Sequence, residues 1–131
     1  MTYRTKFVLL LVTCLLASIA VVSAQSPANA FSTNKNHSRS GRLWVSVDNN
    51  YGTGITHHGN AWTPVGLSKG KWKLTVVTYV KGRKTGVPGI SSFRLGHHDV
   101  YAYANPPRGQ FCAVAKLYNN NRLVDQAAAC I

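Results

Sequence analysis

The sequence contains no glutamate, and its only carboxylate side chains are those of Asp48, Asp99 and Asp125. A glycosidase that works through two carboxylates would have to use two of these three aspartates, which makes that enzyme class an unattractive interpretation. The HExxH, CxxC and GxSxG motifs of common metal and hydrolase sites are absent as well. These absences reduce the number of enzyme classes to which the protein could belong. We expect neither a cofactor nor a metal site.

Cysteine is scarce, and Cys14 lies in the apolar N-terminal segment. The remaining pair, Cys112 and Cys130, predicts one disulfide in a small secreted domain. A hairpin centred at Asn121 would place these two residues directly opposite each other, within disulfide reach. A final helix is the alternative, because residues 126–129 have high helix propensity. The cysteine register favours the hairpin.

Only one apolar run is long, and it extends from Phe7 to Val22 behind the positive charges of Arg4 and Lys6. It ends in the small residues 22–24 that a signal peptidase requires. The run is shorter than the roughly 20 residues that span a bilayer, so an uncleaved anchor is the less favoured alternative. Residues 1–24 are therefore predicted to be a signal peptide, and the protein is expected to be secreted and extracellular.

Basic residues greatly outnumber acidic ones. After residue 24, 13 lysines and arginines stand against three aspartates, which gives a net charge of +10 with histidines neutral. Such a protein is attracted to acidic polysaccharide, phospholipid headgroups or nucleic acid, and salt weakens the attraction. The charge is equally compatible with a role in solubility alone, so it does not identify a partner.

Residues 25–42 are polar and rich in serine and asparagine. This composition predicts a flexible basic arm. Asn36 begins an N-glycosylation acceptor pattern, Asn36-His37-Ser38. The basic residues up to Arg42 resemble a processing site, although an exposed basic arm explains them equally well.

The remaining residues, 43–131, contain six or seven short segments in which apolar and polar residues alternate, separated by turn-forming residues. This pattern, without any amphipathic helix, predicts an all-β fold. We expect one domain, a small antiparallel β-sandwich or barrel of six or seven strands with the disulfide Cys112–Cys130. Residues 87–90, which contain Pro88, are expected to lie in a loop.

Residues 69–84 combine the longest alternating stretch with the densest positive charge. Alternation predicts that Trp72, Leu74, Val76 and Val80 face the core. The predicted binding residues on the other face and at its end are Lys71, Lys73, Tyr79, Lys81, Arg83 and Lys84. Lysines neutralise anionic groups, and aromatic rings stack on sugars or bases. An ordinary solvated face, with lysines protecting an edge strand, is the alternative.

Other aromatic residues bear on the same question. Tyr101 and Tyr103 would extend the basic surface if their strand were a neighbour. The three tryptophans, Trp44, Trp62 and Trp72, are expected to belong to the core rather than to a ligand platform.

Two histidine pairs, His57-His58 and His97-His98, lie in expected loops, and Asp99 follows the second pair. If the loops met, the histidines could serve as metal ligands or as a general acid and base. Adjacent residues on an extended chain point to opposite faces, so each pair would supply only one metal ligand. With a nearby cation, the acid and base could cleave RNA.

These observations predict a secreted, monomeric, non-catalytic protein that binds an anionic extracellular partner, such as a polysaccharide or a microbial or host surface. Its role could lie in defence, virulence or adhesion, and nucleic acid is a possible ligand. The alternative is a small secreted hydrolase, a ribonuclease that uses His57, His58, His97 and His98.

Overall fold

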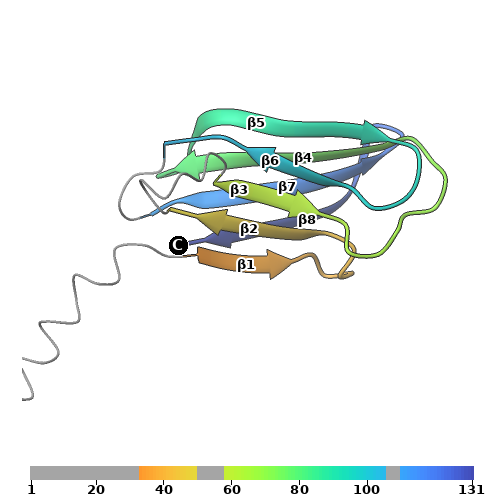
Figure 1. The fold of residues 1–131 in the computed structure, drawn as a ribbon, viewed down its shortest axis with the longest axis horizontal. Helices are drawn as coiled ribbons and strands as arrows, with labels where there is room; N and C mark the ends of the chain where they lie inside the picture. The colour runs from red at the N-terminus through yellow and green to blue at the C-terminus, as the bar shows by residue number, and fades with distance from the viewer. Residues whose placement is uncertain (1–32, 50–57, 106–109) are drawn as a thin grey trace, which may run out of the picture. The chain divides into compact units, whose positions relative to one another are not determined.

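The computed structural model describes residues 33–49, 58–105 and 110–131, which form eight β-strands and no helix. The strands are β1 (Thr33–His37), β2 (Trp44–Asp48), β3 (Gly59–Trp62), β4 (Trp72–Val80), β5 (Arg83–Phe93), β6 (Asp99–Ala102), β7 (Cys112–Asn119) and β8 (Arg122–Cys130). Two antiparallel four-stranded sheets, ordered β1-β2-β3-β6 and β5-β4-β7-β8, form the two layers seen in Figure 1. The predicted all-β sandwich is confirmed, with eight strands in place of six or seven.

The predicted signal peptide, residues 1–24, lies outside the described residues. Within the described ranges, no helix is long and apolar enough to cross a membrane.

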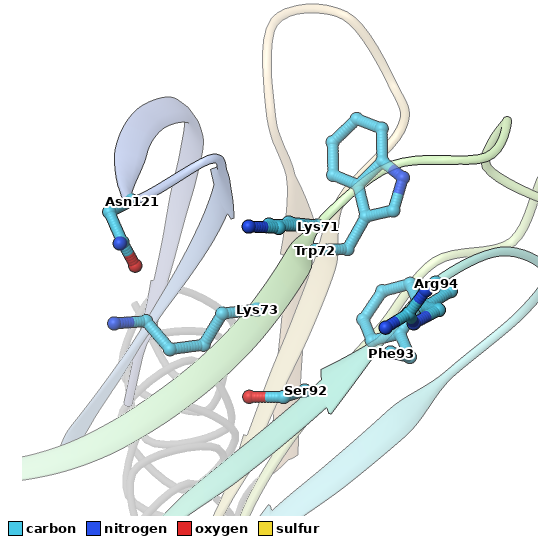
Figure 2. Close-up of a pocket in the computed structure, with 7 residues that line it drawn as sticks. All are labelled: Lys71, Trp72, Lys73, Ser92, Phe93, Arg94 and Asn121. Atoms are coloured by element: carbon cyan, nitrogen blue, oxygen red, sulfur yellow. The ribbon is translucent and has the colours of Figure 1, made fainter.

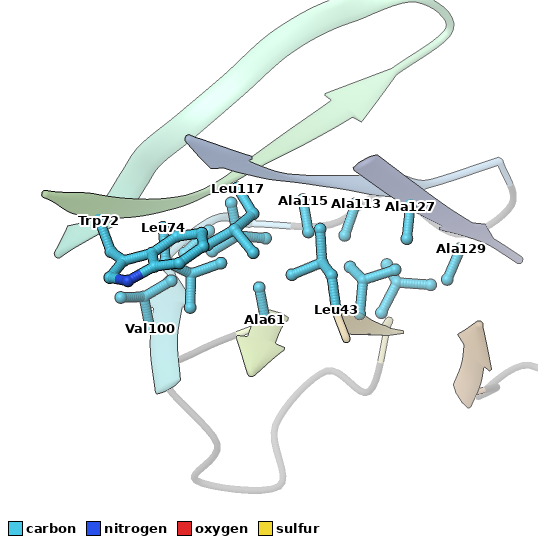
Figure 3. Close-up of a cluster of buried hydrophobic side chains, with 14 of the residues drawn as sticks. Leu43, Ala61, Trp72, Leu74, Val100, Ala113, Ala115, Leu117, Ala127 and Ala129 are labelled. Atoms are coloured by element: carbon cyan, nitrogen blue, oxygen red, sulfur yellow. The ribbon is translucent and has the colours of Figure 1, made fainter. Parts of the chain in front are cut away.

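The core lies between the two sheets and follows the alternation of each strand. Trp72, Leu74 and Val76 on β4 are buried as predicted, and Val80 packs partly buried against the same cluster. Figure 3 shows Trp72 and Val100 at one side of the core and the alanines of β7 and β8 toward the other. Ala127 and Ala129 of β8 are buried where this strand lies against β1 and β2. One apolar face per sheet is enough to hold the two layers together.

The C-terminal hairpin confirms the predicted disulfide. Asn120 and Asn121 form its turn with φ angles of 50° and 63°, the left-handed conformation that two-residue hairpins require. The turn is therefore centred between these two residues, and Val124 is an extra residue in β8. This bulge brings Cys112 opposite Cys130, and their Cα atoms lie 4.1 Å apart in the disulfide.

Strand β1 occupies part of the segment that was expected to be a flexible arm. Its backbone pairs with β2, and its side chains reach the other sheet. The amide nitrogens Nδ2 of Asn34 and Asn36 donate to the backbone carbonyls of Cys130 and Ala128 at 2.9 and 3.0 Å. These bonds satisfy carbonyl groups along the edge of β8, which an edge strand otherwise leaves unpaired. Asparagines rather than apolar residues hold this strand, so hydrophobicity did not reveal it.

The candidate glycosylation and processing residues lie in this same region. Asn36 Nδ2 donates to the Ala128 carbonyl, so a glycan attached to that nitrogen would have to leave this hydrogen bond in place or break it. Ser38 is buried, and its hydroxyl donates to Asp125 Oδ2 at 2.7 Å. Arg42 is exposed at the end of the turn that follows β1, with its Nε 3.9 Å from the same carboxylate oxygen. Glycosylation and processing remain predictions.

Strand β5 contradicts the loop expected at residues 87–90. Pro88 lies within the strand, in a bulge opposite Val77 where residues 86–88 have no register partner on β4, and pairing resumes at Gly89. Proline has no backbone N–H to donate, and sheets accept it on edge strands and at bulges. On its other side β5 lies so close to the residues that follow β6 that a Cβ on Gly86 would collide with the Tyr103 carbonyl oxygen. Glycine is needed here, and its φ of 71° is also left-handed.

Candidate functional site

The outer face of the β5-β4-β7-β8 sheet carries much of the predicted binding surface. Strand alternation places Lys73 and Tyr79 of β4 on it, and Lys84 of β5 lies opposite Tyr79. Lys116 and Tyr118 of β7 join them, with Tyr118 opposite Lys73. The Lys73 ammonium nitrogen lies 4.5 Å from the centroid of the Tyr118 ring, a cation–π distance. We call this surface the basic face. It consists of Lys71, Lys73, Tyr79, Lys84, Arg94, Lys116 and Tyr118.

Two predicted binding residues do not lie on this face. Lys81 is in the two-residue turn between β4 and β5, with Gly82 as its partner and φ angles of 49° and 78°. Arg83 pairs with Val80, which belongs to the inward-facing set of β4, so Arg83 shares that side of the sheet at its exposed end. The predicted stripe is therefore divided by the turn.

A pocket with a volume of 360 Å³ lies at the Lys71 end of the basic face. It is lined by Lys71, Trp72, Lys73, Ser92, Phe93, Arg94 and Asn121. Figure 2 shows the ammonium groups of Lys71 and Lys73 on the side nearer Asn121, and the Arg94 guanidinium beside Phe93. Three cations, a hydroxyl group and an amide thus surround one hollow. Such a set of hydrogen-bond donors suits an anion.

Backbone hydrogen bonds fix the elements that form this pocket. The Gly70 amide donates to the Arg94 carbonyl at 2.8 Å, which joins the entrance of β4 to the end of β5. The Asn120 amide donates to the Lys71 carbonyl at 2.9 Å, which brings the β7–β8 turn to the same place. The Trp72 indole donates from Nε1 to the Ser68 carbonyl at 2.7 Å. The cations therefore project from a constrained backbone.

The charges in the pocket repel one another. Lys71 and Arg94 are the next residues beyond the Trp72–Phe93 pair, so two positive residues lie at the adjoining ends of neighbouring strands. Like charges opposite each other destabilise a sheet. None of the residues described as lining the pocket is acidic. An anion in the pocket would relieve this repulsion.

A second hollow of 250 Å³ lies farther along the basic face. It is lined by Thr75, Val77, Tyr79, Lys84, Pro88, Ile90, Val114, Lys116 and Tyr118. Its floor is apolar and aromatic, while Lys84 and Lys116 supply positive charge. Together the two hollows form a basic path with aromatic rings between the cations.

The acidic residues lie away from this path. Asp48 and Asp99 belong to β2 and β6 of the other sheet, and Asp125 accepts hydrogen bonds from the segment that follows β1. The Tyr101 hydroxyl donates to Asp99 Oδ2 at 2.9 Å. This hydrogen bond, followed by burial and the negative charge of Asp99, raises the pKa of Tyr101 above its ordinary value of 10.0. Positive and negative charge are thus partly separated between the two sheets.

The condition under which Tyr101 and Tyr103 would extend the basic face is not met, because β6 belongs to the other sheet and Tyr103 is joined to β5 by an isolated bridge to Val87. The expectation that all three tryptophans belong to the core is wrong for two of them. Trp72 is in the core as predicted, but Trp44 and Trp62 lie half-buried on the outer face of the first sheet. In β2 and β3 the smaller alternate residues take the inward positions.

The two predicted histidine pairs do not converge in the part of the chain that the structure describes. His58 precedes β3 and its amide donates to the Ala102 carbonyl, whereas His98 lies beside Thr63 at the opposite end of the β3–β6 pair. Thr63 follows His58 by five positions, with β3 between them, which corresponds to roughly 16 Å along an extended strand. His97 accompanies His98, with its Nδ1 3.1 Å from the Thr63 carbonyl oxygen.

This arrangement gives no support to a shared acid–base or metal site. No group of three metal-ligating side chains is found within residues 33–49, 58–105 and 110–131. His57 lies outside the described residues.

Four basic, aromatic or amide residues of the pocket and path that are not buried were not predicted as binding residues, although three had a visible signal. Lys116 and Tyr118 alternate with buried residues of β7, so the alternation of side chains along the strand is enough to place them on the outer face. Arg94 follows the buried Phe93 and takes the opposite side by the same rule. Asn121 was expected in a turn, but its position beside Lys71 depends on the pairing of β4 with β7.

Comparisons with protein-family models, with curated proteins and with solved structures found no match to this chain.

Proposed function

We propose that this is a secreted, monomeric, non-catalytic protein whose basic face binds an anionic extracellular polymer. The observation that carries the proposal is the convergence of Lys71, Lys73 and Arg94 on one pocket that no described carboxylate lines. A sulfate, phosphate or carboxylate group of the polymer would occupy the pocket and accept charge-assisted hydrogen bonds from these side chains.

The rest of the polymer would follow the basic path. Lys116 and Lys84 would neutralise further anionic groups, while Tyr79 and Tyr118 would pack against sugar rings. Acidic polysaccharide of a matrix, a microbe or a host surface meets these requirements best, because it combines repeated charge with rings that can stack. Such binding would suit a role in defence, virulence or adhesion.

Chromatography separates a specific site from a general charge effect. The wild-type protein is applied to a heparin column and to a sulfopropyl cation exchanger, and both are eluted with the same salt gradient. We expect elution from heparin at clearly higher salt, because the pocket recognises arranged anionic groups as well as net charge. Elution from heparin at the same or lower salt would count against the proposal.

The same preparation is incubated with single-stranded RNA to examine the enzymatic alternative. We expect no release of acid-soluble nucleotides, since His58 and the His97-His98 pair lie at opposite ends of the β3–β6 strand pair. Degradation that disappears in both His58→Ala and His97→Ala would overturn the non-catalytic assignment.

A further inference from the structure

The outer face of the β1-β2-β3-β6 sheet, opposite the basic face, carries a continuous row of aromatic side chains. Strand register places His37, Trp44 and Trp62 side by side on β1, β2 and β3, with Asp99 at the end on β6. The ring centroids of His37 and Trp44 lie 5.0 Å apart, and those of Trp44 and Trp62 lie 5.9 Å apart. We call these four residues the aromatic row.

A second row runs parallel to it, two residues along each of the same strands and therefore on the same face. It consists of Lys35, Ser46, Asn60 and Tyr101, which register pairs across all four strands. The Tyr101 hydroxyl bonds Asp99, and the Lys35 ammonium nitrogen lies 5.7 Å from the centroid of the Trp44 ring. This polar row places a line of hydroxyl, amide and ammonium groups directly beside the aromatic row.

Trp62 lies between two hollows on this face. One has a volume of 550 Å³ and is lined by residues that include Lys35, Ser46 and Trp62. The other has a volume of 390 Å³ and is lined by residues that include Asn60, Trp62 and His98. The surface is therefore extended across the strands, with an indole ring at its centre.

We propose that this face binds a neutral polysaccharide, with Trp44 and Trp62 as the stacking surface and Ser46 and Asn60 as hydrogen-bonding partners. A pyranose ring has an apolar C–H face and a rim of hydroxyl groups. The aromatic row matches the C–H face, and the polar row matches the rim. Aromatic walls with a few placed polar groups are the usual composition of small-molecule and sugar sites.

The charge of this face selects a neutral ligand over an anionic one. Asp48 and Asp99 both belong to it, whereas Lys35 is the one lysine or arginine found on its described strands. A polyanion would therefore be attracted to the basic face instead. The proposal does not depend on the polyanion site, since the two surfaces belong to different sheets.

Tryptophan fluorescence titrations with cellohexaose, laminarihexaose and chitohexaose provide the test. We expect a saturable change with at least one of these neutral hexasaccharides. Replacing the central indole in Trp62→Ala should weaken that binding roughly tenfold or more, while Trp62→Phe, which keeps an aromatic ring, should retain most of it. If no hexasaccharide gives a saturable change, or if Trp62→Ala binds as tightly as the wild type, the proposal is wrong.

Two further variants keep the test decisive if Trp62→Ala fails to fold. Ser46→Arg covers the polar row without removing an aromatic ring, and it should also abolish binding. Lys71→Ala/Arg94→Ala on the basic face should leave hexasaccharide affinity unchanged. Loss of hexasaccharide binding in the basic-face variant, with full binding by Ser46→Arg, would place the sugar on the other sheet and overturn the inference.

Discussion

Replacing Lys71, Lys73 and Arg94 together by alanine is expected to weaken binding of a heparin oligosaccharide by roughly 100-fold at low salt. Each of these cations can form a charge-assisted hydrogen bond to an anionic group in the pocket, and the three contributions are lost together. The salt dependence should also change. The slope of log affinity against log salt concentration should become shallower by about 2 to 3, since three anionic contacts disappear. Isothermal titration calorimetry at several salt concentrations measures both quantities.

The control is a triple variant that loses the same charge elsewhere, Lys35→Ala/Arg39→Ala/Arg42→Ala. These residues lie in or just after β1, away from the pocket. A general charge effect would weaken binding equally in the two variants. The pocket predicts a much smaller loss in the control, so similar losses would remove the case for a defined site. Thermal unfolding of both variants checks that each remains folded.

Removing the disulfide is expected to lower the free energy of unfolding by about 3 kcal/mol. The bond joins residues separated by 18 positions, and without it the unfolded chain gains the freedom of that open loop. Cys112→Ala/Cys130→Ala should show the loss in urea unfolding. The wild-type protein with reductant provides a second measurement that changes no residue.

The two measurements should agree within the error of the extrapolation. A loss below about 1 kcal/mol in both would show that strand pairing and β1 hold β8 without the bond. In that case the chain-entropy explanation would be incorrect for this hairpin.

Alternation predicted the fold class and most of the core because every central strand has one apolar face. It placed Trp72, Leu74 and Val76 correctly. The cysteines do lie opposite each other as predicted, but the turn is centred between Asn120 and Asn121, and the bulge at Val124 supplies the shift that aligns them. Strand β1 escaped prediction because side-chain amides and backbone pairing hold it, not apolar burial. Residues 87–90 of β5 escaped prediction because Pro88 and the neighbouring glycine suggest a loop, whereas a bulge in an edge strand accepts both.

The candidate site could be predicted only in part for a related reason. The alternation of side chains along β4 places Lys73 and Tyr79 on one face, and this prediction needs no knowledge of the neighbouring strands. The pocket also requires Arg94 and Asn121, which come from two other segments. Their approach to Lys71 depends on which strands pair with β4, and a single sequence does not specify that order.

The predicted histidine site also depended on strand arrangement, which the sequence alone does not specify. His58 and His98 lie next to strands that pair with each other, so the two expected loops belong to neighbouring elements. Antiparallel pairing nevertheless places the two residues at opposite ends, because each precedes its strand. The residue types suited an acid–base site, but the directions of the strands keep these histidines apart.

The most direct test of the basic-face proposal is chemical-shift mapping by NMR with a heparin tetrasaccharide and the isotopically labelled protein. The account predicts that the largest amide shifts occur at residues 70–73, 92–95 and 119–122, which surround the pocket. Smaller shifts should follow along Lys84 and Lys116. Largest shifts on β1, β2, β3 and β6, or small shifts spread evenly over all basic residues, would contradict it.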